Sequence, residues 1–377
     1  MSRRALVLGA GPAGLAVGAA LRRHGWDGAV ELVDSSERIG ASWSQRYDGL
    51  RLHTVRWLSG LPGAPIPRRY GRWVTRDDFA AYLGSYADQF GLRPALGVTA
   101  TRVDRAGAGW RVGTDCGVRE ADAVVVATGY TRVPVVPDWP GRAGSTVPLR
   151  HSSAYRSPVA YGGRSVLVVG SGNSATEIAS ELAGSGSPVQ LAVRTPPNVV
   201  RRSTLGVPSQ LIGLSMTWAP EPVLNLATGL LRRVSVPDLT AYGLPAPKDA
   251  FTQFLRTRTV PVLDHGFVDL VRSGAIEVVA AVSALDGDAV VLADGRRLRP
   301  DAVVAATGFR PALGDLLGHL GLLDDEGLPR IKGAQSAPGL PDLHVVGITV
   351  ELSGLLREIG READAVGRTL SASLTAR

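Results

Sequence analysis

The sequence predicts an α/β fold built from two parallel-sheet units, one inserted into the other. Two short apolar runs, at residues 5–8 and 165–169, each predict a buried strand, and each is followed by a glycine-rich turn and a helical pattern. The turns are G-x-G-x-x-G at 9–14 and G-x-G-x-x-A at 170–175. Each half also contains a later apolar strand that ends in Ala-Thr-Gly. This internal repeat is typical of two Rossmann-like, dinucleotide-binding domains.

The first glycine-rich turn has a residue for each requirement of phosphate binding. Gly9 allows the tight turn, Gly11 lets the backbone approach a pyrophosphate, and Gly14 lets the helix pack closely on the strand. The start of the helix supplies free N–H groups and the positive end of its dipole. We therefore predict that Gly9, Gly11, Pro12, Ala13 and Gly14 bind a cofactor.

The residue that ends the next strand differs between the two units. The strand at 30–33 ends in Asp34, whereas the strand at 189–193 ends in Arg194-Thr195. An acid accepts hydrogen bonds from a free ribose diol and repels a 2′-phosphate, and an arginine binds that phosphate. The first site therefore suits FAD and the second suits NADPH.

Further residues belong to the same two sites. Trp43, in the loop that follows Asp34, suggests backbone lying close to a flat ligand, although an ordinary loop with a surface tryptophan explains it equally well. The second turn, the Ala-Thr-Gly strand ends and a late glycine complete the predicted cofactor-binding set: Gly170, Ser171, Gly172, Asn173, Ser174, Thr195, Thr128, Gly129, Thr307, Gly308 and Gly347.

The remaining elements are predicted from local patterns. Thr75 has the character of a helix N-cap, and four aromatic or leucine side chains after it follow helical spacing and predict a core face: Phe79, Tyr82, Leu83 and Tyr86. We expect strands at 97–103, 110–114, 123–126, 276–279, 289–292, 302–306 and 343–347. A helix from about 353 to 370 then returns to the first domain.

These elements divide the chain into two domains. We expect an FAD-binding domain of residues 1–160 and 305–377, with an NADPH-binding domain of residues 161–304 inserted into it. Within the insert, residues 196–260 are apolar and rich in proline. They predict either a lid over a substrate cleft or a cover for the second domain.

Composition excludes several classes of protein. The net charge of +7 comes mostly from scattered arginines, which favours a solvated surface over nucleic-acid binding. A single cysteine, Cys116, allows neither a disulfide framework nor a redox pair within the chain, and predicts a cytoplasmic setting. We find no metal-binding motif, no apolar stretch of membrane-spanning length and no signal peptide before the first strand.

Together these motifs resemble the class B flavin monooxygenases, in particular bacterial relatives of the YUCCA enzymes, over essentially the whole chain. The matching pieces are Gly9–Gly14, Gly40-Ala41-Ser42-Trp43, Tyr47 through Thr54, Thr128-Gly129-Tyr130, His151-Ser152-Ser153-Ala154-Tyr155, Gly170–Ala175, Arg194-Thr195, Val262-Leu263-Asp264-His265-Gly266 and Thr307-Gly308-Phe309.

The chain departs from the family pattern at several positions. Ala41 replaces the second glycine of G-G-x-W, and Ser145 and Val147 stand where the identifying motif has Phe and Gly. Tyr155 stands where Baeyer–Villiger relatives carry Trp, which argues against ketone-to-ester chemistry. His53 takes the place of an asparagine that many members hold near the flavin.

The resemblance implies a single-component monooxygenase that uses FAD, NADPH and O2 and transfers one oxygen atom to a small organic substrate through a C4a-(hydro)peroxyflavin. N-, S- or C-oxygenation and YUCCA-like oxidative decarboxylation all remain open, in a secondary-metabolic role. His53 or Thr54 is the predicted catalytic group at the flavin–oxygen site. A homodimer is the family-level expectation.

Two alternatives belong to other classes. An FAD/NADPH-dependent reductase or oxidase would share both nucleotide sites, but Cys116 alone cannot form a redox disulfide. A non-catalytic nucleotide sensor would keep both folds and lack turnover. His151 either contacts NADP, links the domains or is structural, and the structural interpretation is preferred for His24, His265, His319 and His344.

Overall fold

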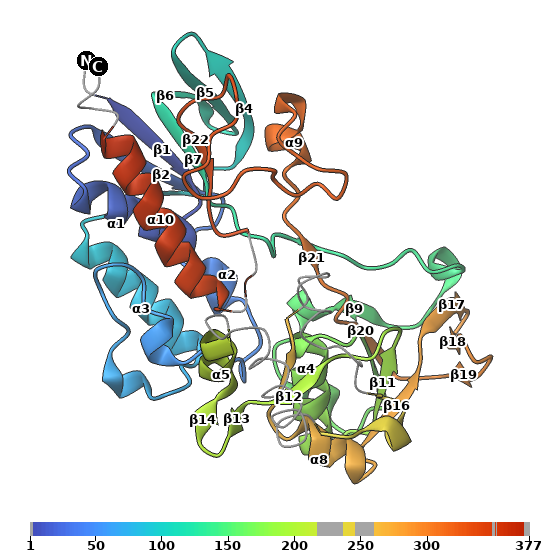
Figure 1. Cartoon of the computed structure of the whole chain (residues 1–377). Helices are drawn as coiled ribbons and strands as arrows, with labels where there is room; N and C mark the ends of the chain where they lie inside the picture. The colour runs from blue at the N-terminus through green and yellow to red at the C-terminus, as the bar shows by residue number, and fades with distance from the viewer. Residues whose placement is uncertain (1–2, 217–236, 246–259, 349–350, 352, 373–377) are drawn as a thin grey trace. The chain divides into compact units, whose positions relative to one another are not determined.

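The computed structural model describes residues 3–216, 237–245, 260–348, 351 and 353–372 (Figure 1). The chain forms two compact units, and both are discontinuous in sequence. Unit 1 comprises Met1–Gln45, Thr54–Val133 and Phe309–Arg377, and unit 2 comprises Arg46–His53 and Pro134–Gly308.

Unit 1 is organised around a parallel sheet with the strand order β22-β7-β1-β2-β3. Its strands are β1 (Arg4–Leu8), β2 (Ala29–Asp34), β3 (Ala95–Leu96), β7 (Ala123–Val126) and β22 (Leu343–Val345). Leu8, at the end of β1, pairs with Val33 on one side and Val126 on the other. Since the chain order reverses at β1, the turn after it occupies the switch point at which such sheets bind ligands.

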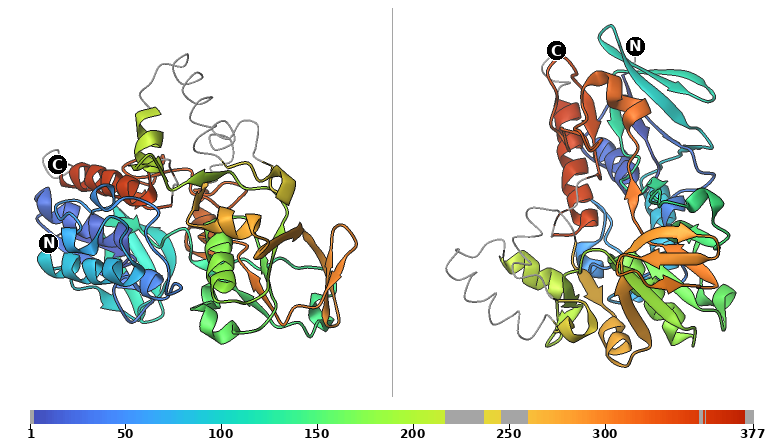
Figure 2. Two further views of the ribbon diagram at one scale, coloured as in Figure 1. Left: turned by 90° about the horizontal axis from the view of Figure 1, so that it is seen from below. Right: turned by 90° about the vertical axis from the view of Figure 1, so that its right-hand side faces the viewer.

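Helices cover one face of this sheet. α1 (Pro12–Arg23) and α10 (Leu355–Ala372) lie side by side (Figures 1 and 2). α3 (Arg76–Gln89) begins as predicted, because the Thr75 side chain accepts a hydrogen bond from the Asp78 amide. The predicted core face of α3 is buried.

The other face of the sheet packs on an antiparallel sheet. Leu6 and Leu8 of β1 share a buried cluster with Trp110 and Val112. This second sheet consists of β4 (Ala100–Ala106), β5 (Gly109–Thr114) and β6 (Gly117–Ala121). Unit 1 is thus a three-layer domain with β1 in its centre.

Unit 2 repeats this plan. Its parallel sheet has the order β16-β11-β10-β20-β9. The strands are β9 (Leu149–His151), β10 (Val166–Val169), β11 (Val189–Val193), β16 (Ile276–Ala280) and β20 (Ala302–Ala305). The predicted strands that end in Ala-Thr-Gly, β7 and β20, each pair in parallel with the strand before a glycine-rich turn.

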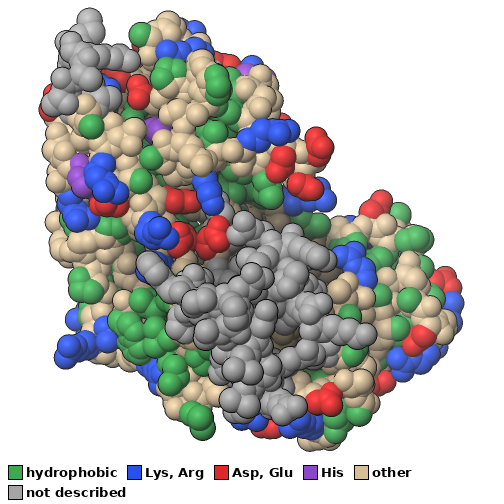
Figure 3. All heavy atoms as spheres, in the orientation of Figure 1, with side chains coloured by type: hydrophobic (Ala, Val, Ile, Leu, Met, Phe, Trp, Pro, Cys, Tyr) green, Lys and Arg blue, Asp and Glu red, His purple; other side chains and the backbone are tan. Residues whose placement is uncertain are grey.

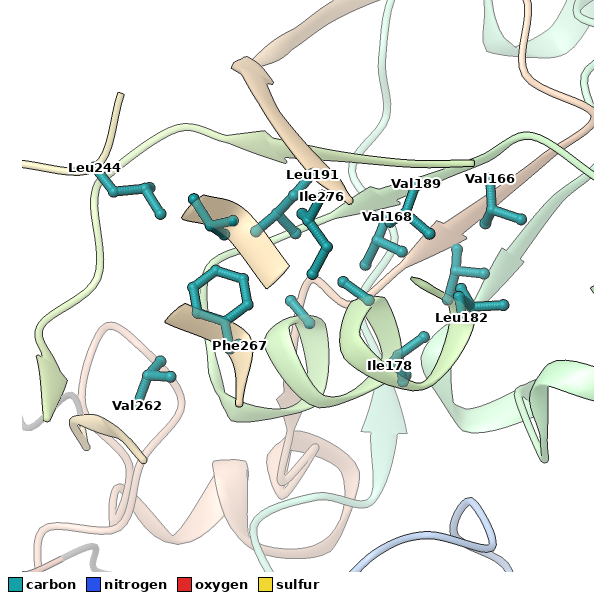
Figure 4. Packing of buried hydrophobic residues seen from close by; sticks show 14 of the residues in the cluster. Val166, Val168, Ile178, Leu182, Val189, Leu191, Leu244, Val262, Phe267 and Ile276 are labelled. Carbon is teal, nitrogen blue, oxygen red and sulfur yellow. The ribbon is translucent and has the colours of Figure 1, made fainter. Parts of the chain in front are cut away.

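The core of unit 2 lies between this sheet and two helices. α4 (Asn173–Gly184) directs Ile178 and Leu182 onto Val166, Val168 and their neighbours, and α8 (Phe267–Arg272) closes the end of the cluster with Phe267 (Figure 4). The opposite face packs on the antiparallel strands β17 (Val282–Asp286), β18 (Ala289–Leu292) and β19 (Arg297–Leu298).

Shorter elements connect these layers. The helices are α2 (Ala41–Ser44), α5 (Ser209–Met216) and α9 (Gly314–Leu317), with 3-10 turns at Arg56–Leu58, Arg68–Tyr70, Arg142–Gly144, Ser152–Ala154, Pro158–Tyr161, Thr240–Tyr242 and Gly318–Leu320. The strands are β8 (Val133–Pro134), β12 (Val199–Arg201), β13 (Ser203–Thr204), β14 (Val207–Pro208), β15 (Val262–Asp264) and β21 (Phe309–Arg310).

The unit boundaries differ from the domain boundaries expected from the sequence. Residues 134–160 fall in unit 2, because β9 pairs with β20 and extends the second sheet. The segment 46–53 also falls in unit 2, although its sequence lies inside the first domain. Of the expected lid at 196–260, residues 217–236 and 246–259 lie outside the described residues, so the lid stays a prediction.

The surface carries both signs of charge. On the face drawn in Figure 3, basic and acidic side chains are interspersed over the coloured residues. In the part of the chain that the structure describes, no helix has both the length and the apolar composition needed to cross a bilayer.

Candidate functional site

The first glycine-rich turn follows β1, and its glycines are required by close contacts. Gly9 has φ +121°, and a Cβ there would lie 2.4 Å from the Ala127 carbonyl oxygen. A Cβ on Gly14 would lie 1.8 Å from the Gly9 carbonyl oxygen. At Gly11, by contrast, a Cβ would meet no atom within 4 Å. Backbone atoms thus block the Cβ positions of Gly9 and Gly14, whereas the Cβ position of Gly11, at the start of α1, is open. A pyrophosphate cradle requires this combination.

Asp34 lies beside this turn at the end of β2. Its Oδ2 accepts the Ala10 amide at 2.6 Å, and its Oδ1 accepts the Ser36 amide at 2.7 Å. Each carboxylate oxygen has a second lone pair. The carboxylate thus orients the turn and keeps acceptor capacity for a ribose hydroxyl.

Other predicted residues surround the same turn. The Thr128 hydroxyl is buried with no hydrogen-bond partner among the described residues, which leaves a polar atom for a ligand. Gly347 has φ +80°, and a Cβ there would lie 2.7 Å from the Ala13 side chain, so it lets β22 end close to α1. The Gly347 amide donates to Glu362 Oε2 at 2.9 Å, and burial raises the pKa of Glu362.

Trp43 is also held near the first turn. Gly40, at φ +64°, donates its amide to the Ala10 carbonyl oxygen at 3.2 Å and so places α2 next to the turn. The Trp43 ring packs edge-on against Phe79, with ring centroids 4.5 Å apart. Its position fits a contact with a flat ligand, which stays a prediction.

The second turn has the same construction as the first. Gly170 has φ +138°, and a Cβ there would lie 2.4 Å from the Ala306 carbonyl oxygen. A Cβ on Gly172 would meet nothing within 4 Å, at the start of α4. Arg194 and Thr195 are exposed at the end of β11, and Arg194 has no ion pair within the described ranges. A cationic group thus stands where unit 1 has Asp34.

Two predicted residues have side chains already engaged in unit 2. The Asn173 amide donates to the Pro261 carbonyl oxygen at 3.1 Å and accepts the Leu263 amide at 2.9 Å, so it fixes β15. The Thr307 hydroxyl donates to the Val135 carbonyl oxygen. These two side chains are therefore held by the protein itself and support the strands around the turn.

His53, the predicted catalytic residue, lies in a cluster that includes a residue the sequence analysis missed. Its Nε2 lies 2.6 Å from Oε1 of Glu177, on the second turn of α4. Tyr47 donates its hydroxyl to Oε2 of the same carboxylate, also at 2.6 Å. Burial raises the pKa of Glu177, but the charge of His53 and the hydrogen bonds from His53 and Tyr47 outweigh it and leave the pKa below its ordinary value. Glu177 is therefore an ionised, buried acceptor.

A second carboxylate one turn later behaves in the opposite way. Glu181 Oε2 accepts the Tyr155 hydroxyl at 3.0 Å. Burial and the nearby Glu177 charge raise the pKa of Glu181, in spite of the Tyr155 hydrogen bond. The environment thus shifts the pKa values of the two acids in opposite directions.

His265 joins the cluster from the loop after β15. Its Nε2 lies 3.9 Å from Glu177 Oε1, and its Nδ1 accepts from Arg202 Nη1 at 2.9 Å. Since Arg202 is always a donor, Nδ1 carries no proton and His265 is neutral. Burial, followed by the Arg202 charge, accordingly lowers the pKa of His265 to about 4.

Thr54, the other predicted catalytic residue, belongs to unit 1, whereas His53 belongs to unit 2. The Thr54 hydroxyl lies 2.6 Å from the Ser59 hydroxyl. The role of Thr54 at a flavin–oxygen site stays a prediction.

Three of the remaining histidines have hydrogen-bond partners within the protein, whereas both ring nitrogens of buried His344 have none among the described residues. Buried His151 accepts the Ser153 amide at Nδ1 and donates from Nε2 to the Gly308 carbonyl oxygen, and burial lowers its pKa. His24 lies 2.8 Å from Asp364, and His319 lies 3.0 Å from the Val103 carbonyl oxygen. Within the described ranges, no group of three or more His, Cys, Asp or Glu side chains is arranged to hold a metal ion.

Comparisons with known proteins identify the family. Residues 6–207 match the family described as pyridine nucleotide-disulphide oxidoreductase. The probable indole-3-pyruvate monooxygenase YUCCA4 of Arabidopsis thaliana is 32% identical over 91% of this chain and 84% of its own length. The indole-3-pyruvate monooxygenase YUCCA8 of Oryza sativa is 35% identical over 88% of this chain and 82% of its own length.

Solved structures have the same fold. A flavin-containing monooxygenase from Stenotrophomonas maltophilia aligns with a TM-score of 0.73 at 23% identity over 99% of both chains. An NADP⁺-bound cyclohexanone monooxygenase from Rhodococcus aligns with a TM-score of 0.71 at 19% identity, over 100% of this chain and 85% of that one. The chain therefore belongs to the YUCCA-related flavin monooxygenases, which are FAD- and NADPH-dependent enzymes.

Proposed function

We propose that unit 1 binds FAD, that unit 2 binds NADPH, and that the enzyme transfers one oxygen atom of O2 to a small organic acid. The observation that carries the assignment is the contrast between two similar glycine-rich turns. One turn is bonded to the carboxylate of Asp34, and the other lies in a unit whose matching strand ends in the exposed cation Arg194.

The residues of the two turns have complementary roles in this proposal. The open space at Gly11 and Gly172 admits a pyrophosphate to the N-termini of α1 and α4. Asp34 accepts ribose hydroxyls, and Arg194 binds a 2′-phosphate. The flavin supplies the redox and oxygen chemistry, while the protein orients the rings and excludes water. His53 holds or transfers a proton at Nδ1, since Glu177 engages its Nε2.

The names of the relatives support a choice among substrate classes. The YUCCA relatives are named for indole-3-pyruvate, a 2-oxo acid, and they match most of the chain. We therefore propose an aromatic 2-oxo acid as the first substrate class to test, with oxidative decarboxylation as the reaction. The reductase alternative is not favoured, because these relatives are named monooxygenases and Cys116 is an exposed free thiol.

We further propose a cytoplasmic homodimer. The single cysteine is compatible with a reducing compartment. Sedimentation of the FAD-loaded protein tests the oligomeric state.

The central test is rapid mixing of NADPH-reduced, anaerobic enzyme with oxygenated buffer. We expect a transient absorbance distinct from that of oxidised and of reduced flavin, and faster decay when an aromatic 2-oxo acid is present. Incorporation of ¹⁸O from ¹⁸O₂ into the carboxylic acid product then identifies oxygen transfer. Direct return to oxidised flavin with stoichiometric peroxide, with and without the acid, contradicts the proposal.

A further inference from the structure

The segment 46–53 is held on unit 2 by contacts from both ends. Near its start, the Asp48 amide donates to the Arg156 carbonyl oxygen at 2.8 Å, and Tyr47 is buried with its ring edge-on to Tyr155. Near its end, Arg202 Nη2 donates to the Leu52 carbonyl oxygen at 3.0 Å. These hydrogen bonds and ring contacts fix the short segment on unit 2.

This segment lies along the first two turns of α4. Tyr47 donates its hydroxyl to Glu177, and the nearby Ser174 side chain lowers the pKa of Tyr47 in opposition to burial. Ser174 belongs to the glycine-rich turn and first helical turn that we assign to NADPH, and Glu177 lies three residues further along α4. The contacts therefore place the segment beside the dinucleotide turn of its own unit.

His53 is the member of the segment with an unused polar atom. Its Nε2 is bonded to Glu177, whose side chain is only 12% exposed. Its Nδ1 has no hydrogen-bond partner in the part of the chain that the structure describes, and the side chain is 31% exposed. Since an ionised carboxylate only accepts, Glu177 accepts a hydrogen bond from the Nε2–H of His53, and Nδ1 is the atom left to a ligand.

We propose that Glu177 is a positioning residue, which fixes His53 beside the dinucleotide turn of unit 2 so that Nδ1 forms a hydrogen bond with the bound nicotinamide nucleotide. This inference rests on the proposed assignment of NADPH to unit 2. Tyr47 is the second support of the carboxylate, and it keeps Glu177 in place when His53 changes.

The charged groups that face His53 come from three elements. Glu177 lies on α4, His265 follows β15 with ring centroids 6.4 Å from His53, and Arg202 follows β12 and bonds to His265. His265 is held neutral by Arg202, so the charge nearest the His53 ring is that of Glu177. Glu177 is therefore the charged group that holds the His53 ring.

The experiment titrates NADP⁺ into FAD-loaded enzyme and follows the change in flavin absorbance, which requires no turnover. The variants are E177Q, H53Q and the double variant, with E181Q as the matched control one turn along α4. We expect E177Q and H53Q each to weaken NADP⁺ binding by roughly tenfold, about the value of a hydrogen bond to a charged group. The double variant should bind no more weakly than either single one, and E181Q should stay within about twofold of wild type.

A conservative variant separates positioning from mere folding. E177D keeps an ionised acceptor for the Nε2–H of His53, so its NADP⁺ affinity should lie between those of wild type and E177Q. H53Q keeps a side-chain amide that can donate to Glu177, so its urea unfolding should match that of wild type while its NADP⁺ affinity falls. An affinity of E177D no higher than that of E177Q would contradict the positioning role.

The outcomes distinguish the two levels of the proposal. If wild type binds FAD but no NADP⁺, the assignment of unit 2 fails. If wild type binds NADP⁺ and both single variants bind it equally well, the assignment stands and the role of Glu177 is overturned. Additive losses in the double variant also overturn that role, since they show that the two residues act independently.

Discussion

The carboxylate of Asp34 accepts the backbone amide of Ala10 at 2.6 Å, so the acid that ends β2 holds the turn that follows β1. The same carboxylate accepts the Ser36 amide. Asp34 is thus both a support of the cradle and a candidate ligand for ribose. The two roles make its removal informative.

The first prediction concerns D34A. Loss of the carboxylate removes charge-assisted hydrogen bonds, each of about 1.5–3 kcal/mol, and we expect FAD affinity to fall by roughly 10- to 100-fold. The flavin-to-protein ratio after gel filtration measures this. D27A removes an exposed acid of the same unit and should retain flavin as wild type does. Full flavin retention by D34A would refute the assigned role.

The second prediction separates space for the ligand from space for the fold. Gly11 has φ −82°, and its Cβ position is empty, so G11A should change the stability of the apoprotein by less than about 0.5 kcal/mol. Its methyl group enters the cradle, and FAD affinity should drop about tenfold or more. In G14A the new Cβ collides with the Gly9 carbonyl oxygen, so the free energy of unfolding of the apoprotein, measured in urea, should fall. Equal flavin binding by G11A and wild type would contradict the cradle.

The third prediction concerns cofactor choice. R194Q removes the exposed cation at the end of β11, and we expect the KM for NADPH to rise about tenfold or more while that for NADH changes little. Anaerobic flavin reduction with both nucleotides gives the ratio. R164Q is the control, because Arg164 precedes β10 and lies at the opposite end of the strand from the glycine-rich turn. A loss shared equally by NADPH and NADH would argue against a 2′-phosphate contact.

The fourth prediction is a pH dependence of stability. The pKa of His265 is lowered to about 4, so between about 4 and the ordinary value of 6.5 the unfolded chain binds more protons than the folded one. Stability from this group is complete above about pH 6.5 and is lost as the pH falls through 4. The loss is at most about 3 kcal/mol, and the 23% exposure of the side chain reduces it. Urea unfolding at a series of pH values gives the free energy of unfolding against pH, and this curve should be less steep for H265Q than for wild type. An unchanged steepness would show that another group titrates.

The fifth prediction compares two helical glycines of unit 1. A Cβ on Gly367 in α10 would lie 2.9 Å from Ala20 of α1, so G367A should destabilise by about 1–3 kcal/mol. A Cβ on Gly84 in α3 meets no atom within 4 Å, and G84A should stabilise by about 0.4–1 kcal/mol through helix propensity. Urea unfolding of the two variants should therefore move in opposite directions. Stabilisation by both would mean that α10 moves aside without cost.

The repeated turns were predictable because their chemistry is local. Gly9 and Gly170 each need a positive φ and a close approach to the end of a neighbouring strand, and only glycine meets both demands. The acid and the arginine at the strand ends follow from the same local order. This is why the two Rossmann-type units could be recognised from the sequence.

The Glu177 cluster was missed because its partners are far apart in sequence. Ser174, Glu177 and Glu181 form a polar stripe on α4, and such a stripe usually predicts a solvated face. Here the face is covered by residues that precede it by more than a hundred positions, through Tyr47 and His53. A glutamate that follows the glycine-rich turn on the same helical face as Ser174 was the available signal.

The units of the structure are divided at other residues than the expected domains for a similar reason. The apolar alternation in 149–151 is too short to predict a strand, yet pairing of β9 with β20 draws residues 134–160 into unit 2. Short strands such as β19 acquire their structure from a neighbouring strand, here β18, rather than from their own pattern.

The interleaving of the two units sets an order for their folding on the ribosome. All segments of unit 2 have been synthesised once residue 308 is added, whereas unit 1 still lacks β22 and α10, which lie in 309–377. The first strands to emerge must therefore wait with an unfinished sheet edge and an uncovered α1 until the late helix arrives. Since exposed edges and apolar faces promote misassembly, unit 1 is the half that we expect chaperones to protect during synthesis.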